Sequence, residues 1–237
     1  MNGERSAFLR LIQDEAHDSV LNMAVDEFLL KKQIQTKDSG AVLRFYRFNK
    51  PAVTVGYGMW KTVQAKMKPQ IPFVRRITGG GMVAHEKSDL TYSLIVSLNS
   101  GSVLRKVRES YFLIHDELRK TFDHFGIKTE LFAKDCKAAS PDSRCKREQI
   151  SYCFDAPVLF DVILSGKKIA GAGQKRTQGY LLHQGSIAWN ALTKIGPSVS
   201  ESEFSDQFSS RIGNLLALTV KRAPLYAEEM QELVSFV

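Results

Sequence analysis

The amino-acid sequence predicts an α+β fold with a mixed or antiparallel central sheet flanked by helices. Short segments rich in β-branched and aromatic residues are joined by turns, and the clearest of them is LTYSLIVSL at 90–98. Few segments repeat apolar residues at helical spacing, whereas a doubly wound sheet would place a helix after almost every strand. At 237 residues the chain can bury a full core, so we expect one domain spanning 1–237.

Four segments are expected to be helical. In the first two, apolar residues recur every three or four positions. Asp18 or Ser19 is expected to cap the first helix, and Gly126 follows the second at the position where helices commonly end. The expected helices are 19–32, 104–125, 201–218 and 226–237.

Eight segments are expected to be strands. A turn at 49–51 joins two of them and keeps its proline out of the sheet hydrogen bonds, and Ser165-Gly166 is expected to form a hairpin turn. The basic, non-periodic segment 133–150 is typical of a mobile loop or lid. The expected strands are 7–12, 41–48, 52–55, 90–98, 128–132, 157–164, 168–175 and 180–188.

Composition and charge narrow the range of partners. The formal net charge of +8 and the isoelectric point near 9.4 favour an acidic partner, such as nucleic acid or an acidic carrier domain. Interleaved aromatic residues, on which bases stack, are not evident, so we expect no nucleic-acid partner. No apolar run reaches the length of a membrane span, and the first residues carry acids without an apolar stretch. We therefore expect no membrane partner and a cytoplasmic location.

The stretch RRITGGGMVAH at 75–85 is the most distinctive in the chain. Its glycines, Gly79–Gly81, are costly to order because glycine loses more backbone freedom on folding than any other residue. Between two apolar runs they indicate a loop that approaches a ligand closely, with backbone N–H groups and Arg76 suited to an anion or a carbonyl. A flexible hairpin connection would explain the glycines alone. The arginines and His85 favour a binding site.

Two further features could carry chemistry. Lys168 opens a strand and is followed by small residues such as Gly171, which would let a ligand lie against the backbone while the ammonium meets a carbonyl or phosphate oxygen. A surface lysine on a hairpin is the alternative. Cys153 ends the basic segment, where nearby cations would favour its nucleophilic thiolate. Burial as a small apolar side chain is the alternative for this cysteine.

Several common catalytic and metal-binding signatures are absent from the sequence. It contains no GxxxxGK[ST] phosphate loop, no GxSxG elbow and no HExxH metal helix. The three cysteines, Cys136, Cys145 and Cys153, have neither CxxC nor zinc-ligand spacing. We therefore expect no metal site.

Four stretches resemble, in the same order, the lipoate/biotin protein ligase family. They are NMAVDEFLL, RFYRFNKPAVTVGYG, RRITGGGMVAH, and GKKIAGAGQKR followed by HQGSI. The resemblance covers about residues 8–190. It implies the α+β fold shared by biotin synthetase and the class II aminoacyl-tRNA synthetases, and acyl transfer to a lysine of an acidic lipoyl domain.

The resemblance also implies roles for particular residues. Lys168 corresponds to the lysine that contacts the acyl carbonyl in the family. The residues implied to lie along the acyl-binding tunnel, at its mouth or in the pocket wall are Arg76, Gly79, Gly80, Gly81, His85, Gly171, Gln184 and Gly185.

The family divides by chemistry. SYCFDAP, which contains Cys153, looks like the nucleophile loop of the cysteine-dependent octanoyltransferases, which hold the acyl group as an enzyme thioester. This branch implies octanoyl acyl carrier protein as donor, a lipoyl domain or glycine cleavage H protein as acceptor, and no cofactor. Three alternatives remain: a lipoate–protein ligase that needs ATP and Mg²⁺, an octanoyl amidotransferase acting between lipoyl domains, and a non-catalytic basic protein that binds carrier domains or nucleic acid.

Overall fold

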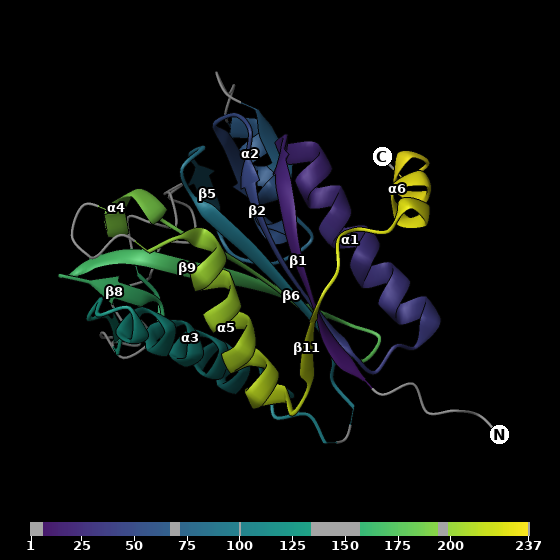
Figure 1. Cartoon of the computed structure of the whole chain (residues 1–237). Helices are drawn as coiled ribbons and strands as arrows, with labels where there is room; N and C mark the ends of the chain where they lie inside the picture. The colour runs from purple at the N-terminus through teal and green to yellow at the C-terminus, as the bar shows by residue number, and fades with distance from the viewer. Residues whose placement is uncertain (1–6, 67–71, 100, 134–156, 194–198, 237) are drawn as a thin grey trace.

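An eight-stranded mixed sheet with helices on both faces forms the centre of the protein, which confirms the predicted α+β class (Figure 1). The structure is a computed structural model that describes residues 7–66, 72–99, 101–133, 157–193 and 199–236. In the order in which they pair, the strands are β11 (Thr219–Arg222), β1 (Phe8–His17), β2 (Ala41–Phe48), β6 (Leu90–Ser97), β10 (Tyr180–Ile187), β9 (Lys167–Thr177), β8 (Val162–Leu164) and β7 (Glu130–Leu131).

The strand directions follow from the connections. β1 runs parallel to β2 and β11, and the other neighbours in the sheet are antiparallel. Parallel neighbours need a long crossover, which helix α1 (Ser19–Thr36) supplies between β1 and β2. The predicted hairpin between β8 and β9 is confirmed, because Ser165 and Gly166 both adopt positive φ angles, of 49° and 75°.

Helix α1 covers part of one face of the sheet. Its N-terminus is capped by Asp18, one of the two predicted candidates, whose Oδ1 accepts the Leu21 N–H at 2.9 Å. The buried side of the helix packs on Val42, Ile95 and Leu182. The C-terminal helix α6 (Ala227–Val234) packs beside it (Figure 1).

Helices α3 (Val107–His124) and α5 (Glu201–Leu216) cover the other face of the sheet (Figure 1). Together with the sheet they enclose the largest core cluster, in which Leu118, Phe204 and Phe208 are among the buried side chains. Gly126 follows α3 with φ 76°, the predicted helix-ending conformation. The helix begins at Val107 and not at residue 104, because the backbone of Lys106 is extended.

A second, three-stranded sheet was not predicted as such. Its order is β4 (Phe73–Arg75), β3 (Ala52–Val55) and β5 (Met82–His85). The predicted bounds of β2 and β3 are confirmed, but β3 pairs with β4 and β5 and not with β2. The strands therefore switch sheets across the turn at 49–51. A 3₁₀ turn η1 (Tyr57–Met59) and helix α2 (Trp60–Lys66), neither of which was predicted, follow β3.

Three further differences concern short or polar elements. The predicted strand 157–164 is wrong in its first half, because β8 starts only at Val162 and the residues before it form a turn. β11 was missed, since Thr219–Arg222 is a short edge strand with no apolar run. The short helix α4 (Trp189–Thr193) was also missed. The predicted loop 133–150 lies outside the described residues, apart from its first residue.

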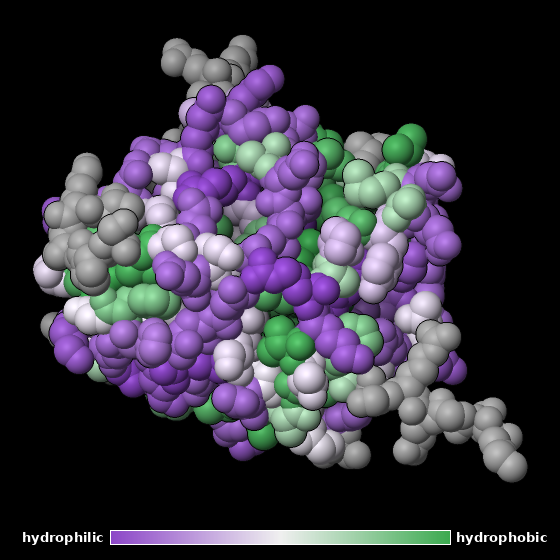
Figure 2. All heavy atoms as spheres, in the orientation of Figure 1, coloured by the Kyte–Doolittle hydropathy of each residue, from purple (hydrophilic) through white to green (hydrophobic). Residues whose placement is uncertain are grey.

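The surface shown in Figure 2 is mainly hydrophilic, and hydrophobic side chains form separate smaller patches on it. Among the helices that the structure describes, none combines the length and apolar character needed to cross a membrane.

Candidate active site

A pocket of about 150 Å³ lies against the main sheet, on the same side as α1. A row of paired residues crosses the sheet at this point. It runs through Tyr46, Thr91, Ser186 and Gly171 on β2, β6, β10 and β9, and all four line the pocket. The small side chains of Thr91 and Ser186, and the absence of one at Gly171, leave the space that the pocket occupies.

The loop at 76–81, called the glycine loop below, forms part of the pocket wall through Arg76, Gly80 and Gly81. The Arg76 guanidinium lies inside the loop and donates to the carbonyl oxygens of Gly79 and Gly81, each at 2.9 Å, and to that of Thr54 at 2.9 Å. Arg76 is buried and lines the pocket. Its hydrogen bonds therefore hold the glycine loop against β3, a role that its sequence position did not reveal.

Close backbone contacts explain the glycines on either side of the loop. A Cβ at Gly173 would lie 2.6 Å from the Gly79 carbonyl oxygen, and a Cβ at Gly56 would collide with the Gly80 carbonyl. Gly80 itself has φ 95°, which side chains rarely tolerate. The Gly79 N–H donates to the Gln174 carbonyl at 3.1 Å, so this N–H group binds β9 and does not face a ligand.

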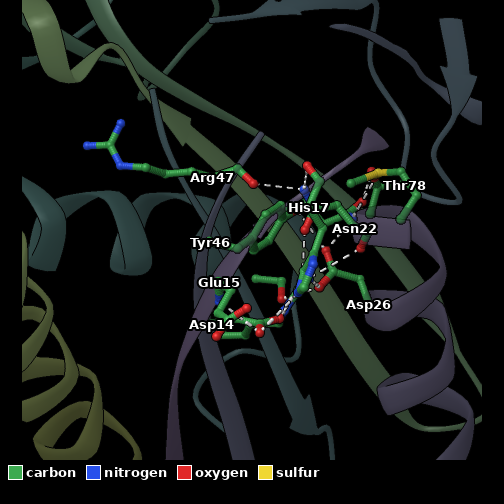
Figure 3. A network of polar contacts seen from close by, with 12 residues as sticks. Asp14, Glu15, His17, Asn22, Asp26, Tyr46, Arg47 and Thr78 are labelled. Carbon is green, nitrogen blue, oxygen red and sulfur yellow. Dashed lines mark hydrogen bonds and ion pairs between the residues drawn. The ribbon is translucent and has the colours of Figure 1, made fainter. Parts of the chain in front are cut away.

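A buried polar network lies beneath the pocket (Figure 3). The Asp26 carboxylate of α1 accepts from Arg44, Tyr46, Ser93 and Gln184 at 2.7–2.9 Å, and both Asp26 and Arg44 have fully buried side chains. Asp26 is thus paired with a cation although it lies on the buried side of α1. A buried ion pair of this kind needs every partner, because an unmatched charge in the interior is costly.

Gln184 links this network to the glycine loop. Its Nε2 donates to Asp26 at 2.7 Å, and its Oε1 accepts from the Thr78 hydroxyl at 2.7 Å. These two bonds fix the orientation of the amide. Through the Gln184 side chain of β10, they connect the glycine loop to α1.

His85 forms part of the pocket wall as a neutral side chain. Its Nε2 lies 2.9 Å from Thr54 Oγ1, its Nδ1 lies 3.4 Å from Ser186 Oγ, and its ring stacks on Phe48 at 4.2 Å. Burial, with a further contribution from Arg76, lowers the pKa of His85 to about 3. The imidazole is therefore uncharged at neutral pH.

Lys168 is the cation in the pocket wall that bears most directly on chemistry. Its Nζ lies 2.8 Å from Asp161 Oδ2, and the two side chains are 5% and 0% exposed. This burial excludes the alternative of a surface lysine. Gly171 provides the room, because a Cβ there would lie 2.6 Å from Lys168 Nζ.

Asp161 is held from two further directions. It accepts the Val158 N–H at 2.7 Å, closing the turn before β8, and the Tyr111 hydroxyl of α3 at 2.7 Å. Burial raises the pKa of Tyr111 well above its ordinary value, and Asp161 raises it further, so the phenol remains a donor. The ammonium of Lys168 is thereby fixed at one place on the pocket wall.

A scan against protein-family models matches residues 18–233 to the lipoyl protein ligase A/B catalytic domain. The chain belongs to this family. The predicted resemblance to lipoate ligases is thus confirmed.

Curated relatives within the family are named octanoyltransferase LipM. The protein of that name from Oceanobacillus iheyensis is 34% identical over 190 residues, which is 78% of this chain and 64% of the relative. The one from Bacillus cereus is 36% identical over 170 residues, which is 70% of this chain and 60% of the relative. The chain thus spans less than two thirds of the length of these relatives.

Solved structures of lipoate ligases share the fold. A putative lipoate protein ligase from T. acidophilum superposes with a TM-score of 0.70 at 20% identity, covering 97% of this chain and 93% of that one. Lipoate-protein ligase A bound with ATP gives a TM-score of 0.68 at 18% identity, with the same coverage. At these identities the likeness concerns the fold.

The pocket brings together eight of the ten site residues predicted from the sequence. They are Arg76, Gly80, Gly81, His85, Lys168, Gly171, Gln184 and Gly185. Gly79 supports the loop from outside the pocket wall. Cys153 lies outside the described residues, so its predicted role stays a prediction.

Sequence reasoning missed Asp161 and Tyr111, which position Lys168. Asp161 lies inside the predicted strand 157–164, and Tyr111 lies inside the predicted helix 104–125. The one available signal was the Asp161 carboxylate within an otherwise apolar VLFDVIL segment. Among the described residues, no three His, Cys, Asp or Glu side chains gather where they could hold a metal ion.

Proposed function

We propose that the protein transfers an octanoyl group from acyl carrier protein to a lysine of a lipoyl domain or of glycine cleavage H protein. The observation that carries the proposal is the 34–36% identity to proteins named octanoyltransferase LipM over 70–78% of the chain. The geometry supports it with a pocket walled by small residues and a buried lysine at its side.

In the proposed first step the Cys153 thiolate attacks the carbonyl carbon of the octanoyl thioester. A new C–S bond forms, the carrier thiolate leaves, and the proton released by Cys153 passes to that thiolate. In the second step the acceptor lysine amine attacks acyl-Cys153, a C–N bond forms, and the Cys153 sulfur leaves with the proton of the amine. Neither step needs an oxidant or a nucleotide, so the proposal includes no cofactor.

We assign to Lys168 the stabilisation of the negative charge that develops on the carbonyl oxygen in both steps. A fixed donor aimed at such an oxyanion contributes about 3 kcal/mol in comparable sites. The Asp161 contact at 2.8 Å supports this assignment, since it fixes the ammonium before the substrate arrives. The proposal places the reaction in the cytoplasm, where reducing conditions keep a free Cys153 thiol.

Intact mass spectrometry tests this function. On mixing with octanoyl acyl carrier protein in the absence of ATP, the protein should gain the mass of one octanoyl group. Cys153→Ala should lose this gain, and Cys145→Ala, in the same basic segment, should retain it. A fully active Cys153→Ala variant, or transfer that occurs only with free acid and ATP, would contradict the proposal and favour the ligase.

A further inference from the structure

The acidic residues of the chain are distributed unevenly around the pocket. The chain contains 25 Asp and Glu residues, yet none occurs from Ser39 to His85 or from Val162 to Ser200. The first of these segments forms the three-stranded sheet, α2 and the glycine loop, and the second forms β9 and β10. Most of the residues that line the pocket thus belong to segments that carry positive charge without carboxylates of their own.

Three side chains concentrate this charge at one point of the surface. The ring of Tyr57 is exposed, and two cations lie over it: the Arg75 guanidinium at 5.2 Å and the Lys175 ammonium at 5.4 Å from the ring centroid. Tyr57, Arg75 and Lys175 are called the docking patch below. Among the ion pairs of the described residues, none neutralises Arg75 or Lys175.

Each member of the docking patch is joined to the glycine loop. The Tyr57 N–H donates to the Thr78 carbonyl at 2.9 Å. Arg75 precedes Arg76, whose guanidinium holds the loop. Lys175 follows Gln174, whose carbonyl accepts the Gly79 N–H at 3.1 Å. The patch therefore lies on segments that are directly joined to the loop that forms part of the pocket wall.

The pocket reaches the surface beside this loop. Gly80 and Val158 both line the pocket and are both exposed, so the pocket wall reaches the surface at these two residues. A protein that presents a group to the pocket through a short arm must touch the surface next to the opening.

We propose that the docking patch binds the acidic acceptor domain and holds its target lysine at the pocket. This inference rests on the proposed function. Paired cations complement a cluster of carboxylates on the partner, and an exposed Tyr beside Arg is the kind of pair that anchors protein interfaces.

The reach of the two substrates identifies the acceptor as the occupant. The acceptor lysine brings only its own four-carbon side chain, so its domain must contact the rim of the opening. The donor carries its acyl group on a longer prosthetic arm, which allows its protein to stand further away. Nucleic acid fits less well, because the patch offers one exposed ring and not a row of stacking surfaces.

Steady-state kinetics of the two half-reactions test the docking patch on the full chain. Arg75→Glu and Lys175→Glu, singly and together, should raise the KM for an acidic lipoyl domain, at least tenfold in the double variant. The kcat and the rate of acyl-enzyme formation from octanoyl acyl carrier protein should stay unchanged. The increase in KM should shrink as salt is added, because exposed charges are screened. Tyr57→Ala should raise the KM with little dependence on salt.

Lys221→Glu is the matched control. Lys221 also lies over an aromatic ring, at 4.8 Å from the Phe8 centroid, but on the edge strand β11 far along the sheet from β9. It should leave the KM for the acceptor unchanged, and thermal melting should show that each variant is folded.

The outcomes separate the patch from the proposed function. An unchanged acceptor KM in the double variant, an equal loss in the donor half-reaction, or an equal effect of Lys221→Glu would overturn the docking patch.

If the unaltered protein transfers no acyl group, the proposed function fails, and calorimetric titration with the acidic lipoyl domain still tests whether the docking patch binds that domain. Charge reversal should then weaken binding tenfold or more. Unchanged affinity, or loss of binding only to a single-stranded oligonucleotide, would overturn it.

Discussion

The two faces of the main sheet are built from the same strands and have opposite characters. The face under α3 and α5, the filled face, carries large buried side chains such as Phe45, Tyr92 and Leu94. The face under the three-stranded sheet, the hollow face, carries Thr91 and Ser186 at the intervening positions and encloses the pocket. Because side chains alternate across a strand, one segment supplies both surfaces.

The difference shows how the protein combines a stable core with a binding cavity. The filled face is held by apolar burial, which tolerates no empty space without cost. On the hollow face such burial is confined to the part under α1, where Val42, Ile95 and Leu182 are packed. Beside the pocket, the Asp26–Arg44 network, which continues through Gln184 to the glycine loop, holds the parts together. The space for substrate thus lies on one side of the sheet only, next to a polar network.

The largest expected effect is the loss of the network beneath the hollow face. Asp26→Ala removes one of the two carboxylates paired with the Arg44 guanidinium, leaving only Asp14 at 2.7 Å. It also leaves the buried donors of Tyr46, Ser93 and Gln184 without their shared acceptor, and we expect the free energy of unfolding to fall by about 3–5 kcal/mol. Leu118→Ala on the filled face should cost about 2–5 kcal/mol through lost packing. Denaturant unfolding measures both. An Asp26→Ala variant as stable as the unaltered protein would show that the network does not hold the hollow face.

Next is the removal of the buried cation from the pocket wall. Under the proposed function, Lys168→Ala should slow both half-reactions by about 10²–10³-fold, because it deletes one oxyanion donor. Lys167→Ala, at the exposed neighbouring position, is the control and should react at the rate of the unaltered protein. Asp161→Asn should slow transfer less than Lys168→Ala, since Lys168 remains but loses its charged partner. Equal rates in all four proteins would remove Lys168 from the mechanism.

A smaller effect is expected from filling the hollow face. Ser186→Val places added methyl groups in the pocket row, so the protein should prefer acyl chains shorter than octanoyl. One methylene is worth about 1–3 kcal/mol in such pockets, so the ratio of kcat/KM for octanoyl over hexanoyl should fall about tenfold or more. Ser97→Val, on β6 outside the pocket, should leave the ratio unchanged. An unaltered preference in Ser186→Val would place the acyl chain elsewhere.

Measured per histidine and per pH unit, the smallest expected effect is a dependence of stability on pH that both faces share. Burial lowers the pKa of His115, on the filled face, to about 4 and that of His85, in the pocket, to about 3. Below about pH 6.5 the unfolded chain binds protons at these histidines and the folded protein does not. Stability should therefore fall as the pH is lowered from about 6.5 to 4, by about 1.4 kcal/mol per pH unit for each histidine.

Asp89 opposes this trend. Burial raises its pKa to about 6, so between pH 6 and 4 the folded protein binds a proton that the unfolded chain does not, which adds stability. Denaturant unfolding across this range should give a shallower slope for His115→Gln, by about 1.4 kcal/mol per pH unit. An identical slope in the variant would mean that His115 is not held neutral.

Most of the fold could be predicted from the sequence. The bounds of β2 and β3, the cap at Asp18 and the Ser165-Gly166 hairpin depend on local backbone preferences, which neighbouring residues determine. The pairing of β3 could not be predicted, since the choice between β2 and β4 depends on which side chains the second sheet buries.

The site was predictable where its residues are unusual in the sequence. Three adjacent glycines and a lysine before small residues indicated the pocket, because close backbone approach leaves a compositional trace. Asp161 left a weaker trace, a single carboxylate in an apolar segment, which does not reveal its partner. The turn that directs it to Lys168 depends on Phe160, which has φ 71° and whose carbonyl contacts His115 of α3 at 2.7 Å.

By itself, the sequence determined the fold class, through the local patterning of its segments, and the resemblance of four of its stretches to a known family indicated the family and the residues of the pocket. Only the tertiary structure decided what several residues do. The Arg76 guanidinium lies inside the glycine loop and binds its carbonyl oxygens, and Lys168 is buried against Asp161. Tyr57, Arg75 and Lys175 come together from three separate segments. Burial and charge pairing arise from contacts between segments distant along the chain, and such contacts exist only once the sheets have packed.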